Sequence, residues 1–282
     1  MGQKAEIPFI LGGHSYIKQL GNDFPTDREL QVKIVETCLN KGIRWFDTTY
    51  QPERIALGNA LDQLGRREEA VVIVWNFFTQ FGPEESVGGA HYYQPHHLEL
   101  MLEQLKTDYI DRLVVHKLGD EKQNRRQEGL AISWQEKGYV RHLGTWAPSA
   151  NALEIFGEDN PYSFMVRPYN ITTNDAAPAF AACKELGWEN YACSPFVRGW
   201  ELDKLVDKSL SRDGGKKLEL RSKISDLMLR YSLFMPHVDR LIVAMRKVEW
   251  IEQNIQSYQK GKITQEELDW LRGVSEIEGG EI

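Results

Sequence analysis

Cysteine is scarce in this chain, and the three cysteines, Cys38, Cys183 and Cys193, lie far apart in the sequence. Three widely spaced thiols provide neither a disulfide framework nor the paired spacing of a zinc site. An odd number of free thiols is typical of a reducing compartment. We therefore expect a cytoplasmic protein without disulfides.

Long apolar runs and runs of basic residues are also missing. No stretch approaches the roughly 20 apolar residues of a membrane span, and the opening segment MGQKAEIPFILGG lacks the apolar core of a signal peptide. The net charge of −7, with no basic run, argues against nucleic acid or an anionic membrane as a main partner. A hydrophobic content of 41% is enough for a full core, so disorder is not expected.

Histidines are the only residues that suggest a metal site. They cluster in the segment HYYQPHH (91–97). His96 and His97 are adjacent, so on a helix they would point to different faces. We therefore expect no metal centre in this segment.

Short apolar runs alternate with amphipathic segments along the whole chain. The apolar runs, typical of buried strands, lie at 8–11, 44–48, 70–75, 111–116, 140–146, 164–169, 189–194 and 240–245. The amphipathic segments, typical of helices, lie at 27–41, 97–106, 176–187, 221–234 and 247–258. Strands that alternate with helices predict a parallel sheet, and eight strands close a (β/α)8 barrel. We predict one α/β barrel domain over residues 1–282, with a C-terminal helix that begins at a capping box from Thr264 to Glu267.

The strand ends indicate where a ligand would bind. In such barrels the ligand site lies at the C-terminal ends of the strands. The segment LKTDYIDRLVVHK places a histidine, His116, at the end of the fourth strand. On this argument, six residues are expected to surround the mouth of the barrel: Asp47, Asn76, His116, Trp146, Cys193 and Met245.

Several segments, in order along the chain, resemble signatures of the aldo-keto reductase family. They are GIRWFDTTYQPERIALGNAL (42–61), LKTDYIDRLVVH (105–116), EKGYVRHLGTW (136–146), YACSPFVRG (191–199) and RLIVAMRKVEWIEQN (240–254). The resemblance implies redox chemistry on a small molecule by a tyrosine, a lysine, an aspartate and a histidine. The aspartate matches Asp47 and the histidine matches His116. The tyrosine matches Tyr50 if the loop after the second strand is shortened.

The lysine that the resemblance implies is missing. The third strand ends VIVWN, so either Trp75 or Asn76 stands at that position, and we take Asn76 as a fourth candidate catalytic residue. A tyrosine with an unperturbed pKa near 10 is a poor acid or base at neutral pH without an adjacent cation. A buried Asp47 would also lack its ion-pair partner.

The resemblance further implies NADP as the cofactor. The residues that would bind its adenosine end match the family better than those that would bind its nicotinamide end. At the adenosine end, Arg246 and Asn254 match the contacts to the 2′-phosphate and the adenine. At the nicotinamide end only Ser194 matches, while Trp146 and Cys193 stand where the family has other residues. These five residues are the candidate cofactor-binding set.

Three functions are therefore compatible with the sequence. The favoured one is an NADP(H)-dependent oxidoreductase with an atypical active site, acting on a carbonyl or alcohol group of a small molecule. The second is a non-redox acid–base enzyme, a lyase or isomerase, on the same barrel. The third is a non-catalytic nucleotide-binding or scaffold protein. Fold alone does not choose among them, because barrels support many chemistries.

Overall fold

Eight parallel strands close into a barrel in the part of the chain that the computed structural model describes, residues 6–17, 27–78, 89–146 and 160–275. The strands are β1 (Phe9–Leu11), β2 (Trp45–Thr48), β3 (Val71–Trp75), β4 (Ile110–Val115), β5 (Val140–Trp146), β6 (Tyr162–Pro168), β7 (Glu189–Cys193) and β8 (Arg240–Val243). Each strand pairs in parallel with the next along the chain, and β8 pairs with β1 to complete the ring. The predicted (β/α)8 barrel is confirmed.

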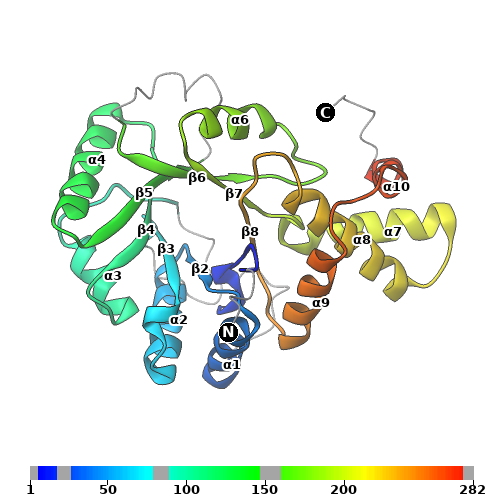
Figure 1. The fold of residues 1–282 in the computed structure, drawn as a ribbon, viewed down its shortest axis with the longest axis horizontal. Coiled ribbons are helices and arrows are strands. Elements are labelled where there is room, and N and C mark those ends of the chain that lie inside the picture. The colour runs from blue at the N-terminus through cyan, green and yellow to red at the C-terminus, as the bar shows by residue number, and fades with distance from the viewer. Residues whose placement is uncertain (1–5, 18–26, 79–88, 147–159, 276–282) are drawn as a thin grey trace.

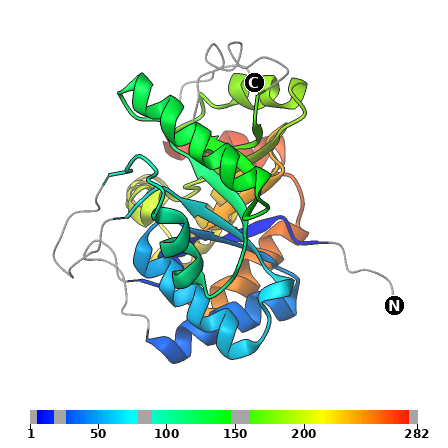
Figure 2. The same cartoon turned by 90° about the vertical axis from the view of Figure 1, so that its left-hand side faces the viewer.

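Helices surround the strands on the outside (Figure 1). They are α1 (Arg28–Lys41), α2 (Gln51–Leu64), α3 (His97–Leu105), α4 (Glu121–Glu136), α6 (Ala177–Glu185), α7 (Trp200–Asp213), α8 (Lys217–Leu233), α9 (Val248–Gln259) and α10 (Gln265–Ser275). Figure 2 shows the same arrangement from the side, with α1 and α2 (blue) below the strands and α4 (green) above them. The amphipathic pattern predicted five of these helices, α1, α3, α6, α8 and α9, and the capping box predicted α10. Neither predicted α2, α4 or α7.

Helix boundaries follow from local chemistry. Asp27 caps α1 by accepting a hydrogen bond from the Leu30 amide at 2.8 Å, and Gly42 ends that helix with a φ of 91°. The predicted capping box of α10 is present, because the Thr264 amide donates to Glu267 and the Glu267 amide donates to Thr264. No helix of the described residues is long and apolar enough to span a membrane.

Side-chain alternation along the strands divides the core into two layers. The inner layer fills the barrel and includes Ile10, Trp45, Ile73, Trp75, Val114, Phe164, Val166, Tyr191, Cys193 and Ile242. The outer layer lies between the strands and the helices and includes residues such as Leu11, Phe46, Val74 and Met245. Because neighbouring residues of a strand face opposite sides, a shift of one position moves a side chain from one layer to the other. This rule decides which strand-end residues reach the mouth.

Candidate active site

Asp47, the third residue of the strand β2, is the buried carboxylate of the barrel mouth. Only 5% of its surface is exposed. Its Oδ1 accepts a hydrogen bond from Nε1 of Trp75 at 2.6 Å, and its Oδ2 accepts one from Oγ1 of Thr49 at 3.3 Å. Burial and the nearby Glu53 carboxylate raise the pKa of Asp47 to about 7, against the lowering effect of the Trp75 bond. Asp47 is therefore able to gain or lose a proton near neutral pH.

The side chain that meets Asp47 from β3 is Trp75, not Asn76. Asn76 is fully buried, and its amide donates to the backbone oxygens of His91 at 2.7 Å and His116 at 3.1 Å. It also lies 3.5 Å from Gln127 of α4, on the outer side of the barrel. The prediction that Asn76 surrounds the mouth is wrong, because alternation turns it outward once Trp75 points inward.

Met245 also does not lie at the mouth. It is fully buried in the outer layer, and its amide donates to Oγ of Ser15 at 2.8 Å. The reason is again alternation: Ile242 faces inward, and Val243 and Met245 face outward. Of the six residues predicted for the mouth, Asn76 and Met245 are the two that the structure moves to the outer layer.

His116 follows β4 directly and lies at the mouth. Its backbone is bonded on both sides, because its amide donates to Oδ1 of Asn76 and its carbonyl accepts from Asn76 and Gln127. Burial lowers the pKa of the His116 imidazole below its usual value, so the ring is neutral at pH 7. Its Nδ1 is buried and has no hydrogen-bond partner in the described residues.

Aromatic rings line the mouth. Phe77 links two sides, with its ring centroid 5.2 Å from Tyr50 and 5.9 Å from His116. Trp146 packs edge-on against Trp75 at 5.3 Å and lies 6.0 Å from His116. Among these rings, the indole of Trp75 is bonded to Asp47, and burial of that carboxylate is the largest cause of its raised pKa.

Cys193 completes the floor of the mouth from β7. It is buried, and desolvation raises the pKa of its thiol to about 12, so it is not a thiolate nucleophile. Its sulfur accepts a weak hydrogen bond from Oγ of Ser194 at 3.8 Å. Ser194 itself is exposed and has a left-handed φ of 60°. Thus Ser194 presents a hydroxyl at the rim, and Cys193 contributes only bulk below it.

Tyr50 begins α2 and is tied to residues that the sequence analysis did not select. Its amide and that of Thr49 donate to Oε2 of Glu53, at 3.1 and 2.7 Å. The other oxygen of Glu53 binds Nδ1 of His14 at 2.8 Å, and the His14 ring stacks on Tyr50 at 6.0 Å. The glutamate three residues into the helix is a capping pattern that would have identified Glu53. Nothing local in the sequence would have identified His14.

A buried arginine behind the mouth was also missed. Arg54 is fully buried, and its guanidinium donates to Oε1 of Gln104 at 2.7 Å and to the carbonyl of Phe77 at 3.0 Å. It also donates to the carbonyls of Thr49 and Trp75, at 3.3 and 3.4 Å. Burial lowers the pKa of Arg54 to about 10, so it stays charged at neutral pH. Arg54 therefore fixes the backbone at the ends of β2 and β3.

A model of the aldo/keto reductase family matches residues 10–276. The chain belongs to this family. The sequence-based assignment to the aldo-keto reductases is thereby confirmed.

Solved members of the family share the fold at low sequence identity. An aldo/keto reductase from Klebsiella pneumoniae, solved with NADP and acetate, has a TM-score of 0.71 at 17% identity, over 97% of this chain and 93% of that one. The holo form of an aldo-keto reductase from Bacillus halodurans has a TM-score of 0.69 at 18% identity, over 95% and 91%. A thermostable aldo-keto reductase bound to the inhibitor epalrestat has a TM-score of 0.68 at 20% identity, over 97% of each chain.

Of the two residues expected to hold the adenosine end of a family cofactor, Arg246 lies between β8 and α9, and Asn254 lies within α9. Arg246 is 8% exposed, and its Nη1 donates to the backbone carbonyl of Ile17 at 2.8 Å. Asn254 is half-buried in the middle of α9. The bond to Ile17 positions the Arg246 guanidinium at the end of β8, next to the loop that follows β1.

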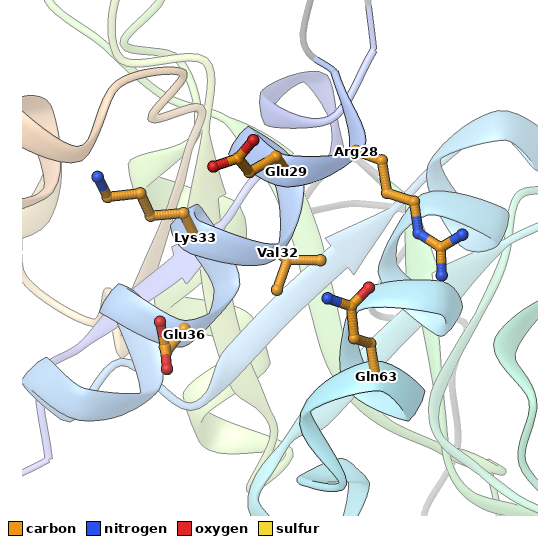
Figure 3. Close-up of a pocket in the computed structure, with 6 residues that line it drawn as sticks. All are labelled: Arg28, Glu29, Val32, Lys33, Glu36 and Gln63. Carbon is orange, nitrogen blue, oxygen red and sulfur yellow. The ribbon is translucent and has the colours of Figure 1, made fainter.

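One groove of the described residues lies outside the barrel mouth. It is found between α1 and α2 and is lined by Arg28, Glu29, Val32, Lys33, Glu36 and Gln63 (Figure 3). It lies on the outer helices, away from the strand ends. Within the described residues, no group of three or more His, Cys, Asp or Glu side chains is arranged to hold a metal ion.

Proposed function

We propose that this aldo/keto reductase family member is an NADP(H)-dependent oxidoreductase with an atypical active site, acting on a carbonyl or alcohol group of a small molecule. The observation that carries the proposal is the buried Asp47 with a pKa of about 7, bonded to the indole of Trp75. In this proposal Trp75 takes the place of the family's lysine, and Asp47 itself supplies the proton. The free, buried cysteines support a cytoplasmic location.

The chemistry of the surrounding side chains fits a dinucleotide. Arg246 offers a guanidinium to the 2′-phosphate and Asn254 an amide to the adenine. At the mouth, Ser194 offers a hydroxyl, and Trp146 offers an aromatic surface that Cys193 cannot. In this proposal the nicotinamide ring would be held chiefly by stacking on Trp146.

Two side chains, Asp47 and His116, then divide the proton transfer and the orientation of the substrate. NADPH, when bound, supplies the hydride that reduces the carbonyl carbon. Protonated Asp47 gives its proton to the carbonyl oxygen, which yields the alcohol and the Asp47 carboxylate. Neutral His116 hydrogen-bonds the same oxygen and orients it. The surrounding rings exclude water and keep the pKa of Asp47 near the working pH.

Cofactor binding is the first test. Tryptophan fluorescence should report NADPH, because Trp75 and Trp146 lie at the mouth. Loss of an Arg–phosphate pair costs on the order of 2 kcal/mol. Arg246→Ala should therefore raise the Kd for NADPH about thirtyfold and leave NADH almost unchanged.

The matched control is Arg125→Ala, which removes an exposed arginine of α4 and should change neither Kd. Equal losses for both cofactors would contradict the phosphate contact. Absence of NADPH binding in the parent protein would reject the oxidoreductase.

The second candidate function is non-redox acid–base catalysis, a lyase or isomerase reaction. The hydrogen bond from Trp75 to Asp47 favours this alternative. In the family a lysine bonded to the aspartate activates the tyrosine, and an indole that takes the lysine's place cannot do so. Asp47 would then exchange a proton with carbon or oxygen of the substrate directly. Turnover of a substrate without any nicotinamide cofactor, abolished by Asp47→Asn, would establish this alternative. NADPH binding without turnover would point to the non-catalytic role.

A further inference from the structure

Three residues of one short segment after β7 have a left-handed backbone. They are Ser194, Val197 and Gly199, with φ values of 60°, 46° and 85°. Glycine adopts this conformation freely, but other residues rarely do, and a β-branched residue such as valine is a clear outlier. Strained backbone persists only where the surrounding structure holds it, and it gathers at ligand sites. The segment from Ser194 to Gly199, which we call the β7 loop, therefore needs a contact that holds it.

Asn170, in the loop after β6, makes such a contact. Its Nδ2 donates to the backbone oxygen of Ser194 at 3.0 Å. The same oxygen accepts the amide of Val197 at 3.2 Å. Asn170 is 1% exposed, so its bond to Ser194 is shielded from solvent. One carbonyl thus joins the Asn170 side chain to the two non-glycine residues of left-handed backbone in the β7 loop.

The other end of the Asn170 amide is fixed by its own loop. Its Oδ1 accepts the amides of Thr172 and Thr173, at 2.9 and 2.8 Å, and the hydroxyl of Thr172 at 2.8 Å. Because a backbone amide can only donate, these bonds determine which end of the side-chain amide is the oxygen. Backbone bonds between Asn170 and Thr173 in both directions close the turn. The nitrogen of the side chain must therefore face Ser194.

The bond from Asn170 to Ser194 extends the pairing of β6 with β7. Pro168 pairs with Cys193 in the parallel ladder, and the amide of Tyr169 donates to the Cys193 carbonyl at 3.0 Å. The Asn170 side chain then takes the next carbonyl, that of Ser194, where the backbone ladder ends. Holding this carbonyl prevents rotation of the peptide group after Ser194. The contact therefore determines how the chain leaves β7 and how Ser194 lies at the rim of the mouth.

We propose that Asn170 is a positioning residue that holds Ser194 in its left-handed conformation and so directs the Ser194 hydroxyl toward the dinucleotide. This role rests on the proposed function, in which Ser194 offers that hydroxyl to NADPH. Asn170 acts through Ser194 and makes no contact with the cofactor itself.

The variant Asn170→Asp separates the two ends of the amide. A carboxylate still accepts the bonds from Thr172 and Thr173, but it cannot donate to the Ser194 carbonyl. The Kd for NADPH, measured by tryptophan fluorescence, should rise about tenfold, as for the loss of one hydrogen bond. With an aldehyde substrate, the KM for NADPH should rise likewise and kcat should stay constant. The matched control is Asn174→Asp, which places the same charge on an exposed residue of the same loop and should leave Kd unchanged.

A double-mutant cycle shows whether the effect passes through the Ser194 hydroxyl. Ser194→Ala removes this hydroxyl and should itself raise the Kd for NADPH. In that background, Asn170→Asp should change Kd by no more than about twofold. A general loss of structure, or repulsion between the new carboxylate and the phosphates, would instead raise Kd in both backgrounds alike. Equal effects in the two backgrounds would therefore overturn the proposal.

A measurement without cofactor tests the contact independently of the enzyme reaction. In urea denaturation, Asn170→Asp should raise the unfolding equilibrium constant about tenfold in the parent. The increase should be smaller in Ser194→Gly, because glycine adopts a φ of 60° without support. If Asn170→Asp alone does not fold, the double variant with Ser194→Gly should fold.

The outcomes distinguish this proposal from the proposed function. Equal increases in the two backgrounds, or a double variant that fails to fold, would show that Asn170 does not hold Ser194. If the increases differ but the parent protein does not bind NADPH, the oxidoreductase fails and the contact between Asn170 and Ser194 stands. If NADPH binds but Asn170→Asp leaves its Kd unchanged, the oxidoreductase stands and the positioning role fails.

Discussion

At the scale of residues, the chemistry of this barrel depends on the surroundings of one carboxylate. Asp47 is buried and feels the charge of Glu53, and both effects raise its pKa, so that it stays protonated at higher pH than an ordinary aspartate. Its folded pKa of about 7 lies above the unfolded value near 3.9. The folded state therefore binds the proton more tightly, and the contribution of Asp47 to stability is lost as pH rises from about 4 to about 7.

Asp47→Asn should remove this pH dependence. The amide keeps an oxygen for the Trp75 indole but carries no charge. Relative to the parent, the variant should gain on the order of 1–4 kcal/mol in free energy of unfolding between pH 5 and pH 8, measured by urea denaturation. Asp62→Asn, which removes an exposed carboxylate paired with Lys106, should show no such gain. If the difference in free energy of unfolding between Asp47→Asn and the parent did not change with pH, the raised pKa would be contradicted.

Trp75 should tune the pH profile of reduction in either direction. The proposed donor is protonated Asp47, so the rate of NADPH oxidation with an aldehyde should fall as pH rises through about 7. Trp75→Phe removes the hydrogen bond that lowers this pKa, and the fall should move to higher pH. Trp75→Lys places a cation on Asp47, and the fall should move to lower pH by roughly 1–3 units. An increase in rate at pH 7 for Trp75→Lys would instead indicate a tyrosine donor.

At the scale of elements, the mouth depends on how closely α2 lies against α3. Gly58 of α2 meets the backbone of Gln104 and Leu105, and a Cβ there would collide with the Gln104 carbonyl. The same contact places Gln104 against Arg54, which holds the ends of β2 and β3. Helix packing outside the barrel is thereby transmitted to the residues at its mouth.

Two glycine-to-alanine changes should have opposite effects on stability. Gly58→Ala forces α2 and α3 apart and should lower the free energy of unfolding by about 2–4 kcal/mol. Gly129→Ala, in the exposed face of α4 with open space around its Cβ, should raise it by about 0.5–1 kcal/mol. Urea denaturation measures both. Equal effects at the two sites would show that α2 and α3 are not packed as described.

At the scale of the whole molecule, one barrel is closed by pairing between its first and last strands. Removing either end opens the ring, so the parts are not expected to fold separately. Thermal unfolding should therefore give one transition, with coincident midpoints from far-UV circular dichroism and from tryptophan fluorescence. Two resolved transitions would contradict the prediction of a single domain over residues 1–282.

The barrel could be predicted from the sequence because its information is local. Eight apolar runs separated by amphipathic segments specify strands and helices through periodicity, and their number and alternation specify a closed parallel barrel. The same pattern brought Asp47, His116, Trp146 and Cys193 to one end. It failed for Asn76 and Met245, because an error of one residue in a strand end reverses the side on which the side chain lies.

The local pattern of apolar and polar residues does not predict the contacts between distant segments that determine the chemistry of the barrel mouth. The bond from Trp75 to Asp47 joins two strands, and the bond from His14 to Glu53 joins residues 39 positions apart. Burial of Asp47 is likewise a property of the closed ring. Residue types and strand ends were determined by the sequence alone, whereas the protonation of Asp47 was decided by tertiary packing, since a pKa depends on desolvation and on charges from distant segments.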